Sequence, residues 1–298
     1  MRLEGKALRG GMMGRPILVG YDESPASTLA LCWAVEEARL RESSVLVCHA
    51  WQWPYPLRPV EREVLAQVER VAAHVVDEGV RRARSLAPDV DVRPRLARGT
   101  ASTVLLQAAR EAELTVLGSR GHGGFEDLQV GSAAVQVPAH SVGPVIVIRP
   151  DAMPTGDRTR IVAGVDGSPA SLAAFGLALE EAALRGGAVT AICCWRDDGP
   201  LARPDWQPFV DSQAIRRGAE ARFHDATSHL TSRHPKVPVT TEFVSERPQR
   251  TLIDATKDAK LLVLGTRGND SPPCLLLGPV TQTALAEARC PVAVTPPP

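Results

Sequence analysis

The chain carries one sequence pattern twice, and this duplication constrains its fold more than any other feature. The block ILVGYDESPAS at residues 17–27 returns as IVAGVDGSPAS at 161–171. Further blocks recur in the same order, and they pair 45–51 with 189–195, 114–121 with 261–268, and 143–148 with 290–295. The offset is 144 residues in the early blocks and 147 in the later ones, so one small insertion separates the copies. We therefore predict two tandem domains of the same fold.

A length of 298 residues suits two domains of about 150 residues each. We predict a disordered leader at 1–15, a first domain at 16–150, a linker at 151–157 and a second domain at 158–298. The linker lies in the stretch RPDAMPTGD, whose Pro, Gly and Asp content is typical of a connection. The leader is basic and glycine-rich but lacks the apolar segment of a signal peptide.

Each copy alternates short apolar runs with longer helical patterns. In the first copy the runs at 17–19, 45–48, 90–96, 114–117 and 145–148 are bounded by Gly, Asp or Pro. Several are apolar on both faces, which is typical of a parallel sheet covered on both sides. The alternation predicts an α/β fold, namely two doubly wound, Rossmann-like domains, each with a five-stranded parallel sheet flanked by helices.

Two helices of the first copy are predicted from their starts and their periodicity. Ser24 suits an N-cap and Pro25 the first helical turn. The apolar face of that helix consists of Ala30, Trp33, Ala34 and Ala38. A second helix spans about 61–86, and its valines at helical spacing are Val64, Val68, Val71 and Val75.

The glycines and polar residues gather where ligands of doubly wound sheets bind, beyond the carboxyl ends of the strands. The turn at 118–124, GSRGHGG, follows a predicted strand, and its glycines allow successive N–H groups to converge on an anion. Gly131 and Ser132 open a helix that runs to about His140, and a helix N-terminus with a hydroxyl favours phosphate. Asp22, at the end of the first strand, is a candidate for holding ribose hydroxyls or a phosphate-bound cation.

These residues resemble the universal stress protein family. Its ATP motif, G-x2-G-x9-G-[ST], is met in full by Gly118, Gly121, Gly131 and Ser132, and VGYD at 19–22 and GPVIVI at 143–148 are similar to its opening and its last strand. The resemblance covers 16–150 and 158–296. It implies a fold like that of the adenine nucleotide α-hydrolases, bound ATP, adenine near the HAW segment at 49–51, and pairing through the last strand.

The predicted nucleotide contacts lie at strand ends, in the glycine turn and at the helix start that follows it. In domain 1 they are Gly20, Tyr21, Asp22, Ser24, Ala50, Gly118, Ser119, Arg120, Gly121, His122, Gly124, Gly131, Ser132 and Ala133. The weaker set in domain 2 is Gly164, Asp166, Ser168, Gly265, Arg267, Gly268 and Gly278. No catalytic residue and no protein-bound metal are predicted, and Mg²⁺ is left open as a companion of ATP.

The second copy departs from the motif at its phosphate end. Pro279 stands where the first copy has Ser132, and proline supplies neither a hydroxyl nor an N–H group. The turn segment HGG at 122–124 becomes NDS at 269–271, followed by two prolines, and Glu246 replaces Gly99. We therefore predict that domain 1 binds ATP more tightly than domain 2.

Several single residues admit two interpretations. His122 either contacts phosphate or is solvated. Arg120 and Arg267 recur in both copies and are either phosphate ligands or exposed arginines. Trp51 and Trp195 hold matched positions and pack locally or form a wall beside the adenine.

Three classes of function remain. The first is a stress-response module that binds ATP and acts through partners, and the second is a slow ATPase or autophosphorylating enzyme of the same fold. The third is a nucleotide-free scaffold. No P-loop, dinucleotide fingerprint or H-x-G-H-type motif is present, and no general base or Mg²⁺ carboxylate pair is evident. These absences favour the binding module over the enzyme.

Composition limits the partners and the compartment. Lys and Arg total 34 and Asp and Glu total 34, so no global basic field attracts nucleic acid or an anionic membrane. No apolar stretch approaches the roughly 20 residues that span a bilayer. The six cysteines form no C-x-x-C pair and suit a reducing cytoplasm. The predicted partners are thus an adenine nucleotide and a second copy of the chain in a homodimer.

Overall fold

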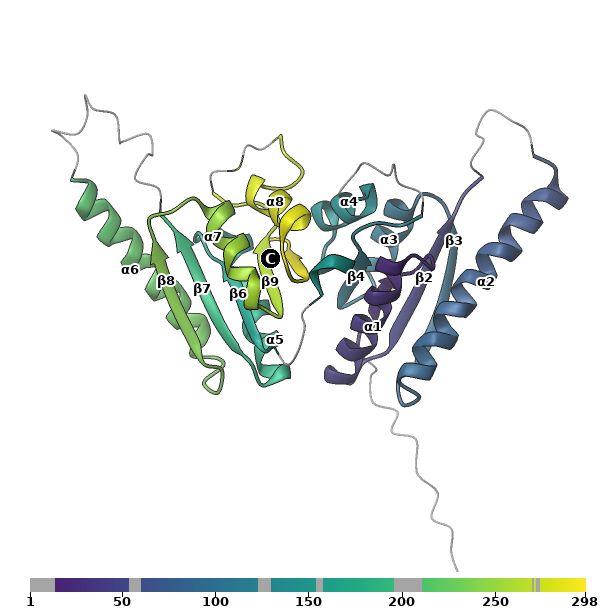
Figure 1. Cartoon of the computed structure of the whole chain (residues 1–298), viewed down its shortest axis with the longest axis horizontal. Helices are drawn as coiled ribbons and strands as arrows, with labels where there is room; N and C mark the ends of the chain where they lie inside the picture. Colours follow the sequence, from purple (N-terminus) through teal and green to yellow (C-terminus); the bar gives the residue numbers. More distant parts are fainter. Residues whose placement is uncertain are drawn as a thin grey trace, which may run out of the picture.

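The structure is a computed structural model and describes residues 14–53, 60–122, 130–153, 158–195, 211–269, 271 and 274–298. Its two halves lie side by side, with α2 and α6 at the far ends (Figure 1). The first half contains β1 (Ile17–Gly20), α1 (Pro25–Leu40), β2 (Val45–Trp51), α2 (Arg62–Leu86), β3 (Val92–Arg98), α3 (Ala101–Ala109), β4 (Leu114–Gly118), α4 (Ser132–His140) and β5 (Val145–Ile148). After a 3₁₀ turn, η1 (Pro150–Ala152), come β6 (Arg160–Gly164), α5 (Pro169–Arg185), β7 (Ala188–Cys194), α6 (Ser212–Thr231), β8 (Val239–Val244), α7 (Pro248–Ala255), η4 (Thr256–Asp258), β9 (Leu261–Gly265), α8 (Pro279–Glu287) and β10 (Val292–Thr295).

The sheet confirms the predicted fold class and adds a junction between the halves. Strand order is β3-β2-β1-β4-β5 in the first half and β10-β9-β6-β7-β8 in the second, with parallel pairing inside each half. At the centre β5 and β10 pair antiparallel, with Ile146 opposite Ala293. The halves therefore share one ten-stranded sheet. The pairing through the last strand that the family resemblance implies occurs here within the chain.

Helices cover both faces of this sheet, as the doubly apolar strands require. One apolar core lies under α1, α2, α5 and α6, and a second core lies under α3, α4, α7 and α8. Strand β5 supplies both, because side chains alternate along a strand: Ile146 faces the first core and Val147 the second. Each core takes residues from both halves, so the junction is packed on both faces of the sheet.

Helix α1 begins where its sequence predicts. The Ser24 hydroxyl accepts a hydrogen bond from the Ser27 amide and caps the helix, with Pro25 in the first turn. The predicted apolar face is buried. Its members are Ala30, Trp33, Ala34 and Ala38.

The second helix forms as its valine spacing predicts, and Val75 packs against the first core, but these valines are not its most buried residues. Val71 is 66% exposed and Val64 is 37% exposed. The buried residues are Ala72, Val76, Gly79, Val80 and Ala83. Small residues let α2 approach the sheet closely, since a Cβ at Gly79 would lie 2.6 Å from the Tyr21 ring. Periodicity alone does not tell which of two apolar stripes meets the sheet.

The remaining boundaries differ from the expectation in detail. The strand expected at 90–96 is observed at Val92–Arg98 and forms an edge of the sheet. Within the expected linker, η1 buries Ala152, while 154–157 lie outside the described residues. Residues 1–13 of the expected leader also lie outside them. Over the described parts of the chain, no helix is both long and apolar enough to cross a membrane.

Candidate functional site

The candidate site of domain 1 lies at the carboxyl ends of β1 and β4. These strands are neighbours, and β2 follows β1 on one side while β4 and β5 lie on the other, so the strand order reverses between them. This is the position at which open α/β sheets bind ligands. Three predicted groups meet here, namely Asp22 after β1, the turn that follows Gly118, and the start of α4.

Hydrogen bonds to Asp22 join the turn after β1 to the turn after β4. Its Oδ1 accepts from the Ser24 amide at 3.1 Å and the Ser24 hydroxyl at 2.6 Å. Its Oδ2 accepts from the His122 amide at 3.0 Å. The Ser24 hydroxyl also lies 3.2 Å from the Arg120 carbonyl oxygen. The carboxylate thus fixes the glycine turn against the start of α1.

The same bonds set the charge of this group. Burial alone would raise the pKa of Asp22, but the hydrogen bonds from Ser24, Ser27 and the His122 amide outweigh it and lower the pKa below its usual value. The site therefore holds a fixed negative charge at neutral pH. A carboxylate accepts and does not donate, so Asp22 suits ribose hydroxyls or a cation rather than a phosphate.

Packing explains two of the three motif glycines. A Cβ at Gly118 would lie 2.7 Å from the Ala26 carbonyl carbon, and one at Gly121 would lie 2.3 Å from Asp22 Oδ2. Both glycines are therefore required by close approaches inside the protein. A Cβ at Gly131 would meet only ordinary contacts, the nearest at 3.4 Å from the Ser119 carbonyl oxygen. Packing of the described residues leaves Gly131 without such a reason.

The start of α4 is held beside the turn by backbone bonds. The Gly131 amide donates to the Ser119 carbonyl at 2.8 Å, and the Ser119 amide donates to the Ile148 carbonyl at 2.7 Å. Gly131 is the N-cap, and no side chain among the described residues caps this helix. Ser132 is exposed and Ala133 is half-buried. The first-turn N–H groups and the Ser132 hydroxyl thus sit together at one end of the site.

Several predicted contacts lie at the ends of β1 and β2, and part of them belongs to the apolar core. The Tyr21 ring is buried against Gly79 and Val47, so it belongs to the core, and only its backbone lies at the strand end. Its carbonyl oxygen lies 2.7 Å from His49 Nδ1. Ala50 is half-buried at the end of β2. Gly20 packs against Leu117, because a Cβ there would lie 2.8 Å from that side chain.

Other predicted residues line the turn or pack beside it. Ser119 is buried, Arg120 is half-buried, and His122 is exposed with its amide bonded to Asp22. Gly124 lies outside the described residues. Trp51 is buried, with the Arg98 guanidinium 5.7 Å from its ring centre, which favours local packing.

Domain 2 repeats the framework of the site. Asp166 Oδ1 accepts from the Ser168 amide at 3.0 Å and its hydroxyl at 2.6 Å, and Oδ2 accepts from the Asn269 amide at 2.8 Å. A Cβ at Gly268 would lie 2.2 Å from Asp166 Oδ2, and one at Gly265 would lie 2.8 Å from the Ala170 carbonyl carbon. Gly164 packs against Leu264, as Gly20 does against Leu117. The two turns are therefore built alike.

The phosphate end of domain 2 differs from that of domain 1. The Gly268 amide donates to the Ser271 hydroxyl at 3.2 Å, and a Cβ at Gly278 would lie 2.8 Å from that oxygen. Ser271 thus lies over the start of α8, at the position where domain 1 has Gly124. The Arg267 guanidinium donates to the Leu275 carbonyl at 3.4 Å. Helix α8 begins at Pro279, which contributes neither an N–H group nor a hydroxyl.

The structure adds residues that the site prediction left out. The Ser27 hydroxyl accepts from the Asp22 amide at 3.3 Å, and Ser171 does the same for Asp166. Both serines end the first repeated block, so the duplication itself was the signal that could have identified them. Ala26 is the residue against which Gly118 packs, and no sequence signal pointed to it.

The cysteines of the described residues are free thiols, of which Cys32 and Cys274 are exposed. No cluster of three or more His, Cys, Asp or Glu side chains suitable for a metal is present there. Burial raises the pKa of the Cys193 thiol to about 12 and that of Cys194 to about 11. Burial thus keeps these two thiols protonated at neutral pH.

Comparison with known proteins gives consistent matches over both halves. A profile of the Universal stress protein family matches residues 13–149 and again 158–296. Universal stress protein Rv2005c of Mycobacterium tuberculosis is 30% identical over 294 residues, which cover 93% of this chain and 96% of that protein. Universal stress protein Rv2623 of the same species is 30% identical over 289 residues, with 93% and 95% covered. The crystal structure of a universal stress protein from Archaeoglobus fulgidus covers 95% of this chain and 96% of its own, with a TM-score of 0.70 and 17% identity, and so is similar in fold.

Proposed function

Because this chain belongs to the Universal stress protein family, we propose that it is an ATP-binding module of the stress response that acts as a nucleotide-dependent regulator or protectant. Domain 1 holds the stronger site. Binding to the folded state stabilises that state by mass action, so the occupancy of the site reports the level of ATP. The protein acts through the conformation that ATP stabilises rather than through turnover.

One observation carries this proposal: the start of α4 and the Asp22 carboxylate lie at the same switch point with complementary chemistry. The first-turn N–H groups and the Ser132 hydroxyl are suited to phosphate, and the carboxylate is suited to ribose. Gly131, which packing does not require, leaves room for close approach of a ligand to the backbone. ATP presents both kinds of group.

The residues of domain 1 divide between the parts of the nucleotide. Ser132, Ala133 and Gly131 receive the phosphates at the helix start. Asp22 receives the ribose. The backbone around Tyr21 and Ala50 borders the adenine. Mg²⁺ enters with the triphosphate in this proposal, and the described residues contain no cluster of three or more His, Cys, Asp or Glu side chains that could hold it. Arg120 and His122 lie in the turn that follows β4 and contact the phosphates in this proposal, and Gly124, outside the described residues, is kept as a contact from the sequence motif alone.

Domain 2 binds ATP more weakly in this proposal. Its Ser271 hydroxyl already accepts the Gly268 amide and lies above Gly278, where a phosphate oxygen would approach. Pro279 removes the donors that Ser132 supplies. Two features of domain 2 therefore weaken its binding of ATP. The Ser271 hydroxyl occupies the space above Gly278, and Pro279 supplies no hydrogen-bond donor.

Mass spectrometry of small molecules released from the purified protein tests the proposal. We expect intact ATP, at about one molecule per chain. Release of ADP, or a phosphorylated protein, would favour the slow enzyme instead. Protein that carries no nucleotide and takes up none in a titration would leave the scaffold as the function.

The matched variants Ser132→Pro and Pro279→Ser make the site assignment specific. The first change is expected to remove most of the ATP binding, because it removes the phosphate donors of domain 1 alone. Pro279→Ser is the matched control, because it gives domain 2 the N–H group and the hydroxyl that Ser132 supplies in domain 1. Equal ATP affinity of wild type and Ser132→Pro would contradict the assignment to domain 1.

The predicted homodimer remains a prediction. Both last strands are paired on each side within the chain, so a dimer has to use a surface other than β5 and β10. A cytoplasmic location is proposed from the six free cysteines, which a reducing compartment keeps reduced.

A further inference from the structure

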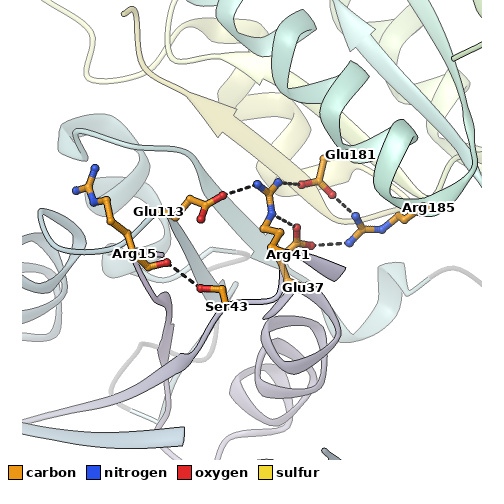
Figure 2. A network of polar contacts seen from close by, with 7 residues as sticks. All are labelled: Arg15, Glu37, Arg41, Ser43, Glu113, Glu181 and Arg185. Atoms are coloured by element: carbon orange, nitrogen blue, oxygen red, sulfur yellow. Dashed lines mark hydrogen bonds and ion pairs between the residues drawn. The ribbon is translucent and has the colours of Figure 1, made fainter. Parts of the chain in front are cut away.

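A buried cluster of charges joins the two halves on the α1 and α5 side of the sheet (Figure 2). Arg41 donates to Glu37 at 2.6 Å, to Glu181 at 2.5 Å and to Glu113 at 2.7 Å. Arg185 donates to Glu37 at 2.5 Å and also pairs with Glu181. The Glu37 and Glu181 side chains have no exposed area. Every carboxylate oxygen of these two residues faces a guanidinium of its own half or of the other half.

The centre of this cluster follows the internal repeat. Glu37 and Arg41 of α1 correspond to Glu181 and Arg185 of α5 at the offset of 144 residues. Each glutamate lies one helical turn before its own arginine and also reaches across to the arginine of the other half. These four residues alone would suit a pair of identical domains equally well, because the arrangement is symmetric.

The periphery of the cluster breaks that symmetry. Before β4 stands Glu113, and the matched residue before β9 is Lys260. Glu113 pairs with Arg41, whereas the Lys260 ammonium lies 5.2 Å from the centre of the Trp33 ring. The Arg185 guanidinium lies 5.3 Å from the same ring. Two cations of domain 2 thus contact an aromatic ring of domain 1, whose counterpart in domain 2 is Leu177.

The formal charges of six groups balance in the observed pairing, and a seventh group, the half-exposed Glu36 of domain 1, lies 3.9 Å from the Lys260 ammonium at the rim. With Arg41, Arg185 and Lys260 against Glu37, Glu113 and Glu181, the six-charge cluster is neutral. Two surfaces of the domain 1 type would bring together two arginines and four glutamates. Two surfaces of the domain 2 type would bring together two arginines, two lysines and two glutamates. Two domain 1 surfaces would therefore hold an excess of negative charge at a junction whose central glutamates are fully buried, which is costly away from water.

We infer that the six-charge cluster determines which domains pair. It makes the α1 surface of domain 1 accept a domain 2 surface and reject a second domain 1. Its partner is domain 2 of the same chain. The β5–β10 pairing by itself does not discriminate, because both strands are short and apolar. A second domain 1 is rejected because its charges would be unbalanced. The two domains of one chain therefore pair with each other instead of pairing with like domains of another chain.

A double-mutant cycle on the full chain tests this inference. The variants are Glu113→Lys, Lys260→Glu and the two changes together. Each single change gives the observed pairing an excess of two charges, whereas the double change restores balance with the roles exchanged. Burial and the neighbouring Glu37 charge raise the pKa of Glu181 to about 7, so the cycle is measured at pH 8, where that carboxyl is ionised.

We expect each single variant to lower the thermal midpoint by about 5 °C or more, and the double variant to recover more than half of the loss. Hydrogen exchange supplies the readout specific to pairing. In the single variants the amides of β5 and β10 exchange at least tenfold faster, while those of β1 stay protected. In the double variant the protection of β5 and β10 returns.

The control cycle uses Asp77→Lys and Arg217→Glu, which reverse exposed charges on the outer helices α2 and α6. Their effects should be small and additive. The inference is overturned if the Glu113 and Lys260 losses simply add in the double variant. It is also overturned if the single variants leave exchange at β5 and β10 unchanged.

Discussion

The two halves of the ten-stranded sheet carry the same turn but differ at the start of the helix that follows it. In domain 1 the Asp22 carboxylate holds the His122 amide, and α4 begins with Gly131 and an exposed Ser132. In domain 2 an equivalent carboxylate holds an equivalent amide, yet the helix that follows begins with Pro279. Close approaches at the first two motif glycines are nearly identical in the two halves. The two halves are therefore alike at positions where packing inside the protein requires a given residue. They differ at positions where only a bound ligand would require one.

This difference separates two reasons for keeping a glycine motif. Gly118 and Gly265 are required by the backbone of the following helix, whatever the ligand. Among the described residues nothing imposes such a requirement on Gly131 and Ser132, so their presence in domain 1 is the more informative sign of a ligand. A match to the spacing alone, as in domain 2, indicates the fold and not the ligand.

The largest expected effect concerns the part that the halves share. Removing one partner of the buried charge cluster in Glu181→Ala should lower the free energy of unfolding by about 3–5 kcal/mol, because two guanidiniums lose a buried carboxylate. The matching change Glu37→Ala should cost a similar amount. Urea denaturation at pH 8 measures both. Glu180→Ala, one residue away and exposed, is the control and should stay within about 0.5 kcal/mol of wild type. Unequal losses of stability in Glu37→Ala and Glu181→Ala would show that the two halves do not contribute equally to the cluster.

The next effect concerns the glycines that packing requires. Gly118→Ala and Gly265→Ala should each cost about 1–3 kcal/mol, because the new methyl group meets backbone atoms of α1 or α5 that have little freedom to move. Gly131→Ala should be nearly neutral for folding, since its nearest contact is ordinary. Thermal unfolding without nucleotide measures all three. A loss at Gly131 as large as that at Gly118 would show that Gly131, too, is a packing residue.

A smaller effect concerns the ligand. Ser132→Pro should weaken ATP binding by about tenfold or more, since the helix start loses an N–H group and a hydroxyl. Pro279→Ser combined with Ser271→Gly should strengthen binding by domain 2, because it restores donors and clears the space above Gly278. Calorimetric titration of the full chain gives both affinity and stoichiometry. One site in wild type and two in the double variant is the expected result, and two equal sites in wild type would refute the asymmetry.

The smallest effect concerns pH and should be the same in both halves. Hydrogen bonds hold the pKa of Asp22 and of Asp166 below the usual value of 3.8, against the opposing effect of burial. The unfolded chain therefore binds protons more readily, and the stability from each carboxylate is present above about pH 4 and lost as the pH falls through the native pKa. Urea midpoints between pH 7 and pH 3 should fall less steeply in Asp22→Asn and Asp166→Asn than in wild type. Curves parallel to that of wild type would argue against a lowered native pKa.

Much of the fold was predictable because it depends on local pattern and on repetition. The strand and helix alternation predicted five parallel strands per half, and Ser24 with Pro25 predicted the start of α1. The valine spacing predicted the helix α2 but not which of its residues are buried, because two apolar stripes of one helix have the same period and only the sheet surface selects between them. The same limit applies to Tyr21, which stands at a strand end in the sequence but turns its ring into the core.

The sequence by itself determined the tandem duplication, the α/β class, the family resemblance and the replacement of Ser132 by Pro279 in the second copy, since each of these can be read from residue identity and spacing. Only the tertiary structure decided three other features. They are the merging of two sheets through β5 and β10, the placement of Ser271 over the start of α8, and the contact of Arg41 and Arg185 with both Glu37 and Glu181. The placement of Ser271 depends on the path of a short loop, which residue identity does not specify. For the strand junction and the contacts between the two halves, the physical reason is distance along the chain. Residues more than a hundred positions apart carry no local signal of their contact, and only the folded sheet brings them together.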